Sequence, residues 1–473
     1  MQKISVILNN FLFFLVIFLF VFIPLYPKFP LLNIKGTFVA IRLEDIFIAI
    51  TLFLWALNLL FSGGLKKFFK DKLNQAILLF LLIGVFSVFS GVFLTSSVVP
   101  HLSLLHFLRR VELLMLLPVC ISVISSKRKF IWVLIVITAV VLFVNGYGIG
   151  QQYLGWPVIS TTNSEFSKGL FLSLSPGARI NSTFAGHYDL AVFLAMILSV
   201  FTAVFFGVKK RIKIVIAILG VISFFVLIMT SARLSFVAAL VGVIVSLTLA
   251  KKRKYILLLV VFVMIFLIYP SQLRERLIST ITVNLFSQGQ RYVGKTQDQQ
   301  IRGKLNIPTL AVQTSSTSAK TSVFATQSGV ATDIAPGEPV DTTELGVYRS
   351  LQIRLNIEWP RALRAFIKNP FLGTGYSSID IATDNDFLRS LGEVGLLGTI
   401  ALGLVLIETT KRISRLLKSN DRFIRYFSAG ILSMSLAFLV NGLFIDVFEA
   451  SKVASLFWMV LGVNLAVLNF KHD

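Results

Sequence analysis

The sequence is short of charged residues, cysteine and histidine. Asp, Glu, Lys and Arg together make up 14% of its 473 residues, whereas a water-soluble domain averages about 25%. Its single cysteine, Cys120, excludes an internal disulfide, and its four histidines do not have the spacing of metal ligands. No phosphate-binding loop of the nucleotide type is present. These absences argue against a soluble enzyme, a disulfide-stabilised domain and a zinc protein.

Long apolar runs fill most of the chain instead. Apolar residues account for 56% of the sequence, and about 20 consecutive apolar residues cross a bilayer as a helix, so the chain has room for about twelve spans. The predicted spans are 5–26, 43–61, 76–95, 103–124, 130–150, 185–207, 212–230, 234–250, 255–270, 393–411, 423–444 and 452–469. Spans one to nine fall in residues 1–270 and spans ten to twelve in residues 393–473. We therefore expect an all-α polytopic membrane protein of about twelve transmembrane helices.

Basic residues outnumber acidic ones by 45 to 22, which gives a net charge of +23. The tightest basic clusters lie in short gaps between apolar runs, at every second gap, as the positive-inside rule produces. They are Lys66, Lys67, Lys70 and Lys72; Lys127, Arg128 and Lys129; Lys209, Lys210, Arg211 and Lys213; Lys251, Lys252, Arg253 and Lys254; and Lys411, Arg412, Arg415, Lys418, Arg422 and Arg425. This pattern predicts that these gaps and both termini are cytoplasmic. It favours contact with anionic lipids over nucleic-acid binding.

Two gaps on the opposite side are long. The first covers about residues 150–185, and the second is a large extracytoplasmic loop at residues 271–392, between the ninth and tenth spans. Within this loop, residues 287–345 are rich in Gln, Thr, Ser, Ala and Gly, and such a segment buries too little apolar area to offset its ordering entropy. We expect no catalytic residue in this low-complexity insertion. Helical spacing of apolar residues predicts an amphipathic helix over residues 348–368.

Charged residues gather near the outer ends of three spans. The three groups are residues 179–189, residues 230–236, and residues 373–376 with 384–398. Charges at this depth are costly, so each is a functional hypothesis by default. The planar guanidinium of arginine binds phosphate oxygens through two parallel hydrogen bonds and stays charged. Several arginines at the headgroup level therefore predict a lipid diphosphate as ligand.

Four short segments follow one another in a fixed order between residues 130 and 465, outside the insertion. They are Arg179 with Ser182-Thr183-Phe184; Thr230-Ser231-Ala232-Arg233; Pro370-Phe371-Leu372-Gly373-Thr374-Gly375; and Asn385 with Leu388, Leu391, Glu393, Gly395 and Gly398. In this order they resemble the O-antigen ligase and O-antigen polymerase family of bacterial membrane glycosyltransferases. The resemblance implies a multi-helix fold that takes undecaprenyl-diphosphate-linked glycans as donors on the outer face of the cytoplasmic membrane. It also implies transfer without a metal or another cofactor.

One position departs from the ligases of that family. The ligases carry a His directly before the Asn that matches Asn385, where it is read as activating the acceptor hydroxyl, but this chain has Asp384 there. A carboxylate also accepts protons, yet its unperturbed pKa near 3.9 makes it a weak base unless burial raises that pKa. Asp384 therefore favours an O-antigen, capsule or exopolysaccharide polymerase. A ligase that transfers glycan to a lipid or protein acceptor is the alternative.

These patterns give each candidate residue a role. We predict that Asp384 activates the acceptor hydroxyl while Arg179 and Arg354 hold the diphosphate. The predicted substrate-binding residues are His187, Arg233, Arg349, Arg361, Asn385 and Asp386. Each has a structural alternative, because arginines near span ends also reach headgroups and Asp or Asn also caps helices. For Glu393 the structural reading is preferred, as a favourable charge near a helix end. For Arg109, Arg110 and Glu112 an internal ion pair is preferred over catalysis, with Arg109 or Arg110 facing the donor as the alternative.

A transporter or flippase for polysaccharide or lipid is the rival from another functional class. About twelve spans suit it, but the two halves show no repeat and acidic residues at mid-membrane depth are few. The predicted partners of the enzyme are the donor glycan, a glycan or lipid-linked acceptor and anionic lipids, together with a flippase and a chain-length regulator. No nucleic acid is expected.

Overall fold

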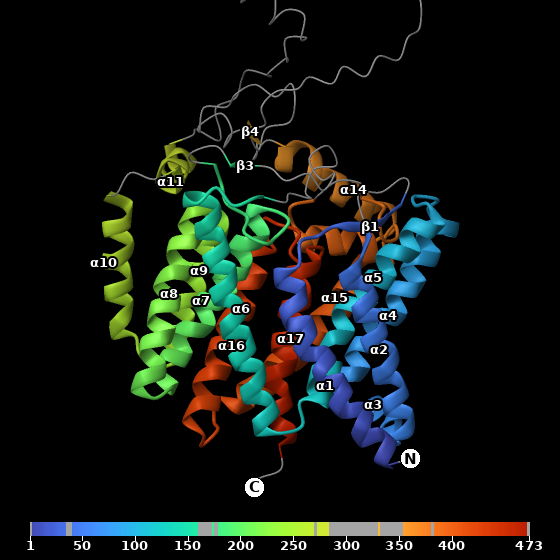
Figure 1. The fold of residues 1–473 in the computed structure, drawn as a ribbon. Coiled ribbons are helices and arrows are strands. Elements are labelled where there is room, and N and C mark those ends of the chain that lie inside the picture. The colour runs from blue at the N-terminus through green and yellow to red at the C-terminus, as the bar shows by residue number, and fades with distance from the viewer. Residues whose placement is uncertain are drawn as a thin grey trace, which may run out of the picture.

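The computed structural model describes residues 2–34, 40–158, 173–174, 178–268, 272–282, 330–331, 353–379 and 383–470. Helices dominate this part of the chain (Figure 1). The helices are α1 (Gln2–Leu25), α2 (Leu43–Phe61), α3 (Leu65–Lys70), α4 (Lys72–Phe89), η1 (Ser90–Leu94), α5 (Pro100–Val123), α6 (Lys127–Tyr153), α7 (His187–Gly207), α8 (Lys210–Met229), α9 (Arg233–Leu249), α10 (Lys254–Ile268), α11 (Gln272–Thr282), η2 (Arg354–Glu358), α14 (Trp359–Lys368), α15 (Asp386–Leu416), α16 (Arg422–Asn441), α17 (Ser451–Ala466) and η3 (Val467–Asn469). The predicted all-α class is confirmed.

Strands are few and short in the described residues. Strand β1 (Pro30–Asn33) pairs antiparallel with β2 (Ala40–Arg42), directly before α2. Strand β3 (Ser173–Leu174) pairs in parallel with β4 (Val330–Ala331). Apart from β4, the predicted insertion at residues 287–345 lies outside the described residues, as does the start of the predicted amphipathic helix at 348–352.

Nine helices among the described residues are long and apolar enough to cross a membrane. They are α1, α2, α4 with η1, α6, α7, α8, α15, α16 and α17. The other three predicted spans also coincide with helices: α9 and α10 are shorter, and α5 carries the charged residues Arg109, Arg110 and Glu112 in its middle. The chain is therefore a multi-span membrane protein, whereas the count of twelve spans stays a prediction.

Two helices form the centre of the bundle. In α7 and α17, 83% and 89% of an apolar stretch of 18 residues is buried inside the protein, whereas the share is 28% in α1, α2 and α8. Helix α7 packs against α16, α9 and α8, and α17 packs against α5 (Figure 1). These two helices are therefore surrounded by other helices on nearly all sides. Helix α10 stands at the edge instead, with apolar side chains such as Leu257 and Ile268 exposed.

The five basic gaps meet at one end of the bundle. Arg412 bonds to Asp71 at 2.9 Å, which joins the α15 end to the α3–α4 gap. Lys127 contacts Asp421 at 3.2 Å, which joins the start of α6 to the α15–α16 gap. Arg422 donates to the Phe206 carbonyl, and the Lys252 ammonium lies 5.7 Å from the Phe206 ring centroid, which adds the other two gaps. The five basic gaps thus lie at the same end of the molecule, as the charge pattern predicts. That this end is cytoplasmic stays a prediction.

Helix α15 begins at Asp386, before the predicted span start at residue 393, and breaks at Gly395. Gly395 has φ 66°, and a Cβ there would lie 2.4 Å from the Phe371 carbonyl oxygen. The break frees backbone groups that the Pro370–Gly375 turn takes up: Leu396 N–H donates to the Pro370 carbonyl at 2.8 Å, and Gly375 N–H to the Glu393 carbonyl at 2.9 Å. A broken helix is tolerated in a membrane where neighbours satisfy it in this way. The turn therefore fixes the first half of α15, which carries the charged residues described next.

Candidate functional site

Three of the predicted arginines gather at the end of the bundle opposite the basic gaps. Arg179 precedes α7, Arg233 is the first residue of α9, and Arg354 begins η2. Arg233 lies within range of the charges of both Arg179 and Arg354. Strand β3 and helix α14 lie at this end, away from the chain termini (Figure 1). The fold thus brings together three cations that lie 54 to 175 positions apart in the sequence.

Arg179 contacts His187 at the start of α7. Its Nη1 atom lies 3.1 Å from Nε2 of His187. A guanidinium only donates hydrogen bonds, so this contact requires the neutral imidazole with its lone pair on Nε2. The His187 ring also lies against Tyr188, with centroids 4.1 Å apart. His187 therefore orients Arg179 in this structure.

The Ser182-Thr183-Phe184 segment anchors the loop that carries Arg179. Ser182 has φ 51° and is buried, and a left-handed backbone is uncommon for a residue other than glycine. Gln151 of α6 holds both backbone groups of Ser182: its Oε1 accepts from the N–H at 2.7 Å and its Nε2 donates to the carbonyl at 3.0 Å. The Ser182 hydroxyl donates to the Val144 carbonyl at 2.7 Å. This part of the motif is structural.

Lys452 fixes the same loop from the centre of the bundle. This fully buried lysine of α17 donates to the carbonyls of Pro24 at 3.3 Å, Tyr26 at 2.7 Å and Thr183 at 2.6 Å. Its ammonium also lies 5.3 Å from the Phe184 ring centroid. Sequence reasoning gives no role to it, because Lys452 is the first residue of the predicted span 452–469 and a lysine at a span end commonly reaches the lipid headgroups.

The Thr230-Ser231-Ala232-Arg233 segment is a tight turn between α8 and α9. Ser231 has φ 52°, the Thr230 hydroxyl donates to the Leu227 carbonyl at 2.6 Å, and Ala232 N–H donates to the Thr230 hydroxyl at 3.3 Å. These bonds close the end of α8 and start α9 at once. The turn therefore places Arg233 at the N-terminus of α9, beside the other two arginines.

Arg354 and Asp384 form the best-defined ion pair of this region. The Nε and Nη2 atoms of Arg354 both bond to Oδ2 of Asp384, at 3.0 and 2.6 Å, and Nη2 also bonds to the Phe444 carbonyl at 3.3 Å. Arg354 is buried at the start of η2, a π-helical turn. Such turns are rare and occur frequently at functional sites.

Asp384 combines burial with an unusual backbone. Its φ is 49°, which is costly for a residue with a side chain. Burial raises the pKa of its carboxyl above the usual value, while the charge and hydrogen bonds of Arg354 work in the opposite direction and nearby Asp446 adds to the rise. A partly buried carboxylate with a raised pKa is a better base than a free aspartate.

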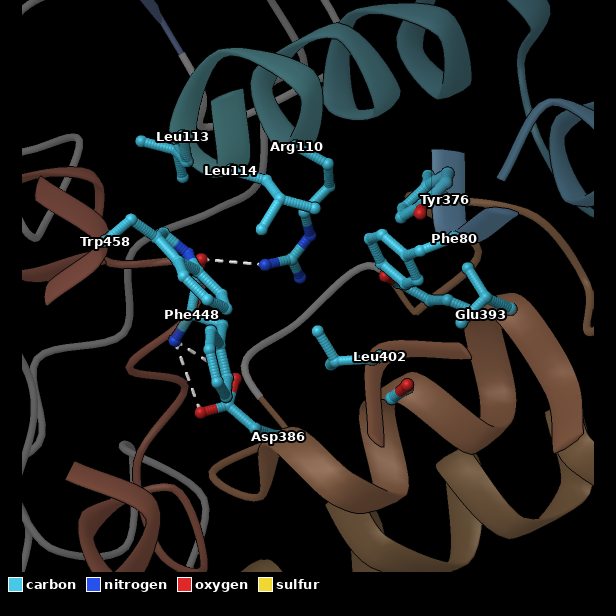
Figure 2. Close-up of a pocket in the computed structure, with 12 residues that line it drawn as sticks. Phe80, Arg110, Leu113, Leu114, Tyr376, Asp386, Glu393, Leu402, Phe448 and Trp458 are labelled. Atoms are coloured by element: carbon cyan, nitrogen blue, oxygen red, sulfur yellow. Dashed lines mark hydrogen bonds between the residues drawn. The ribbon is translucent and has the colours of Figure 1, made fainter. Parts of the chain in front are cut away.

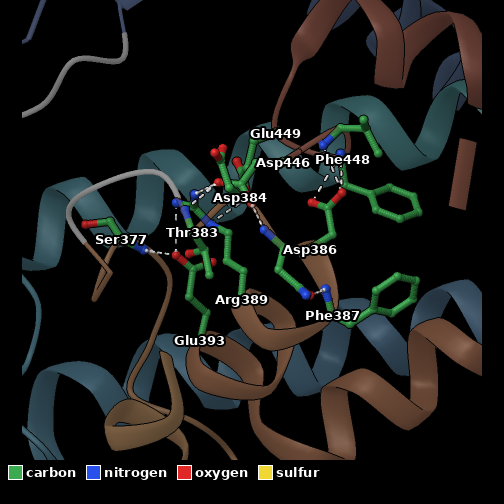
Figure 3. Close-up of polar contacts among 12 residues, drawn as sticks. Ser377, Thr383, Asp384, Asp386, Phe387, Arg389, Glu393, Asp446, Phe448 and Glu449 are labelled. Carbon is green, nitrogen blue, oxygen red and sulfur yellow. Dashed lines mark hydrogen bonds and ion pairs between the residues drawn. The ribbon is translucent and has the colours of Figure 1, made fainter. Parts of the chain in front are cut away.

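Asp446, between α16 and α17, holds the backbone around Asp384. Its carboxylate accepts from the N–H groups of Thr383 at 2.8 Å and Asn385 at 3.2 Å, and from the guanidinium of Arg389 at 2.9 Å (Figure 3). Asp384 lies between the first two of these anchors. Sequence reasoning missed Asp446, because no spacing links it to residues 383–389.

Arg389 connects this site to the interior. Besides Asp446 it contacts Glu393 at 3.3 Å and Glu449 at 3.4 Å (Figure 3), and Glu449 also pairs with Arg110 of α5. All of these side chains are less than about a quarter exposed, at 3% for Glu393 and 21% for Glu449. Alternating charges compensate the burial of each one. The structural role predicted for Glu393 is therefore consistent with its contacts. Arg389 is a further residue of the site that sequence reasoning did not single out.

Asn385 and Asp386 bind the protein's own backbone. The Asn385 side chain caps α15 by accepting from the N–H groups of Phe387 and Leu388, and its amide donates to the Leu443 carbonyl. Asp386 accepts from the N–H groups of Val447 and Phe448. Their predicted contact with substrate stays a prediction.

Arg361 and Arg349 are the remaining predicted substrate-binding residues. Arg361 is on α14, within range of the charge of Glu358. Arg349 lies outside the described residues. Arg109 bonds to Asp45 of α2 at 3.0 Å and to the Ala40 carbonyl at 3.1 Å. It is therefore in an internal ion pair, but its partner is Asp45 and not Glu112 of its own helix. Among the described residues no group of three or more His, Cys, Asp or Glu is placed to hold a metal ion.

A small cavity of about 40 Å³ lies inside this network (Figure 2). Its lining includes Arg110, Tyr376, Asp386 and Glu393. The Tyr376 hydroxyl is buried and has no hydrogen-bond partner among the described residues. A cavity of this size holds a few waters at most and is too small for a sugar. It is part of the support of the site and not a substrate pocket.

The comparison with known families agrees with this geometry. A family model described as O-antigen ligase matches residues 218–403, which include Arg233, Arg354, Asp384 and the broken first half of α15. No curated protein matches the chain. Nine helices of the described part are able to span a membrane, and the matched segment contains three of the four predicted motifs, so over residues 218–403 this membrane protein is similar to the O-antigen ligase family.

Proposed function

We propose that this protein polymerises lipid-linked oligosaccharide, using an undecaprenyl-diphosphate-linked glycan as donor on the outer face of the bacterial cytoplasmic membrane. The family match supports glycan transfer in a membrane. The observation that carries the finer proposal is the convergence of Arg179, Arg233 and Arg354 beside the partly buried carboxylate of Asp384. A ligase that transfers the same kind of glycan to a lipid or protein is the alternative.

The arginines would bind the donor diphosphate. Each charge-assisted hydrogen bond contributes roughly 1.5–3 kcal/mol, and the charge on the leaving diphosphate grows in the transition state. Two arginines that strengthen their bonds at that point lower the barrier by several kcal/mol, which is about three powers of ten in rate. Arg179 and Arg354 are the arginines that we assign to the diphosphate first. Arg233 lies within range of the charges of both.

The acceptor hydroxyl would bind beside Asp384. Its oxygen attacks the anomeric carbon of the donor sugar and its proton passes to a carboxylate of the site. The bond between that carbon and the diphosphate oxygen breaks, and undecaprenyl diphosphate leaves with the electron pair. A single displacement inverts the anomeric configuration. The chemistry uses energy already stored in the donor and consumes no nucleotide.

Transfer by the purified protein tests this function. In detergent, with a synthetic lipid-diphosphate oligosaccharide as donor and acceptor, we expect longer glycans and free lipid diphosphate, both measured by mass spectrometry. A transporter would leave the oligosaccharide unchanged in detergent, because its activity needs a sealed membrane. Glycan that is transferred only to an added lipid-core or protein acceptor, with no lengthening of the donor oligosaccharide, would identify a ligase.

Two variants test the assigned residues. Arg179→Ala is expected to slow transfer by about 10²-fold through lost leaving-group stabilisation, and Asp384→Asn by about 10²–10⁴-fold through loss of carboxylate chemistry. Folded Arg179→Ala protein that still makes full-length polymer would remove Arg179 from the diphosphate site. Full activity in Asp384→Asn would do the same for Asp384.

A further inference from the structure

Glu358 lies on the same face of the π-helical turn as Arg354. The turn η2 closes through a hydrogen bond from Trp359 N–H to the Arg354 carbonyl, and a π turn is wider than an α turn, so residues four apart nearly eclipse. Both ends of the turn point inward: Arg354 is 5% exposed and Glu358 is 9% exposed, whereas Leu355 and Ile357 between them are 45% and 48% exposed. The turn thus presents one cation and one acid to the site.

The carboxyl group of Glu358 has an unused oxygen. No donor in the described part of the chain bonds to its buried Oε2 atom. A buried polar atom without a partner costs stability and is rare in folded proteins. The Arg354 N–H groups with described bonds go to Asp384 and the Phe444 carbonyl, not to Glu358. Glu358 is therefore a buried acid with one carboxyl oxygen that no described group binds.

Four charged groups act on Glu358 from the surrounding segments. They are Arg354 of the same turn, Asp384 before α15, Asp446 between α16 and α17, and Arg361 of α14. Burial is the largest effect and raises the pKa of Glu358 to about 7, Asp384 and Asp446 add to the rise, and the two arginines oppose it. A group with this pKa both accepts and releases a proton near neutral pH.

We propose that Glu358 is the proton acceptor of the transfer reaction, so that the site works with two carboxyl groups. Asp384 holds the acceptor hydroxyl by a hydrogen bond, and Oε2 of Glu358 takes the proton as the hydroxyl oxygen bonds to the anomeric carbon. The proton later leaves to solvent, which restores the carboxylate. This inference rests on the proposed glycan transfer and assigns one more residue to it.

The pairing of Asp384 explains why a second carboxyl is needed. Both described bonds from Arg354 to Asp384 fall on the same oxygen, Oδ2, and they oppose the rise that burial gives to the pKa of that carboxyl. An oxygen that two arginine N–H groups hold is a weaker proton acceptor than one without such bonds. Glu358 has a free oxygen in the same charged cluster, which provides that capacity.

The pH dependence of transfer separates the two carboxyl groups. We would measure kcat and KM from pH 5 to 9 for the wild type, Glu358→Gln, Glu358→Asp and Asp384→Asn. The wild type is expected to lose activity below an apparent pKa near 7, as Glu358 becomes protonated. Glu358→Gln should lower kcat by about 10²–10⁴-fold with KM little changed and should abolish this acid limb. Glu358→Asp should keep the limb at a reduced rate, and Asp384→Asn should keep it too.

The outcomes distinguish this inference from the proposed function. Wild-type protein that transfers no glycan contradicts the function itself. Wild-type activity together with a Glu358→Gln variant that keeps both its rate and its acid limb overturns the role of Glu358 and leaves the function standing. Loss of the limb in Asp384→Asn alone also overturns it. Glu408→Gln, which removes a carboxylate paired with Arg412 at the other end of α15, is the matched control and should transfer normally.

Thermal unfolding gives a readout that does not depend on activity. The folded-state pKa of Glu358, about 7, lies above that of an unfolded glutamate, about 4.3. The unfolded state therefore loses this proton first as the pH rises, and the folded state loses stability between those two values. Glu358→Gln should match the wild type near pH 4.5 and melt at a higher temperature at pH 8. A constant difference across that range would show that Glu358 is not a buried titrating acid.

Discussion

At the scale of single residues, Arg354 can bind either Asp384 or a phosphate through the same N–H groups. The Nε and Nη2 groups that hold Asp384 are the same groups that a phosphate would use. If Arg354 binds the donor phosphate through these groups, as proposed, its bonds to Asp384 lengthen or break and Asp384 becomes available to the acceptor. In that case the pair links arrival of the donor to exposure of the carboxylate.

Replacement of Arg354 by lysine tests this dependence on the guanidinium. Lysine keeps the charge but cannot form two bonds in a fixed fork. Arg354→Lys should fold and should slow transfer by about 10–10²-fold, as expected for the loss of one charge-assisted bond of roughly 1.5–3 kcal/mol, measured as kcat/KM. Arg364→Ala, on the exposed side of α14, is the control and should be close to wild type. Equal rates for Arg354→Lys and the wild type would contradict the forked contact.

The sequence alone identifies Arg179, Arg233, Arg354 and Asp384 as candidates, because charged residues are rare in an apolar chain. The sequence does not predict which groups these side chains contact. Asp446 holds the residues on both sides of Asp384, yet the two aspartates are 62 positions apart and meet only because of how α15 packs beside α16. Asn385 was found by motif, but its capping bonds depend on where α15 starts.

At the scale of elements, the break in α15 positions the charged first half of that helix. The Gly373 and Gly395 backbones approach each other so closely that a Cβ on Gly373 would lie 2.3 Å from the Glu393 carbonyl oxygen. The turn and the break were visible in the sequence only as glycine-rich segments. The start of α15 was predicted late because Asp386, Arg389 and Ser390 interrupt the apolar residues of 386–392, and a hydropathy pattern does not distinguish a helix end of mixed polarity from a loop.

Alanine at position 395 tests the break. Gly395→Ala combines a left-handed backbone, which costs about 1–3 kcal/mol, with a clash against the Phe371 carbonyl. We expect a strongly lowered melting temperature in detergent and loss of transfer. Gly403→Ala in the second half of α15 is the matched control: a Cβ there meets nothing within 4 Å, and alanine favours a helix by roughly 0.5–1 kcal/mol. Similar melting temperatures for the two variants would show that the break is not required.

At the scale of the whole molecule, the bundle has two different ends. One end collects the basic gaps, with ion pairs such as Arg412 with Asp71. The other collects the arginines and buried carboxylates of the site. Periodicity and charge predicted the helices and their alternation well, since both are local properties of the sequence. The central position of α7 and α17 was not predictable in the same way, because a lipid-facing helix and a protein-covered helix are equally apolar.

Removal of the buried ammonium at position 452 tests how the two halves of the bundle are joined. Lys452→Met leaves three carbonyls without their donor, each at a cost of about 1–3 kcal/mol, partly offset because no charge is buried any longer. We expect a net loss of about 3 kcal/mol or more, seen as a lower melting temperature, and weaker transfer because the Arg179 loop loosens. Lys418→Met, at an exposed position after α15, should change stability by less than about 0.5 kcal/mol. Unchanged stability in Lys452→Met would remove this lysine from the scaffold.

Lys452 also imposes an order on biogenesis. The carbonyls that it binds belong to Pro24, Tyr26 and Thr183, which leave the ribosome hundreds of residues before it does. The end of α1 and the Arg179 loop therefore wait, without their shared donor, until α17 has been inserted. Until then the loop that carries Arg179 lacks one of the bonds that hold it in the folded protein, the bond from Lys452 to the Thr183 carbonyl.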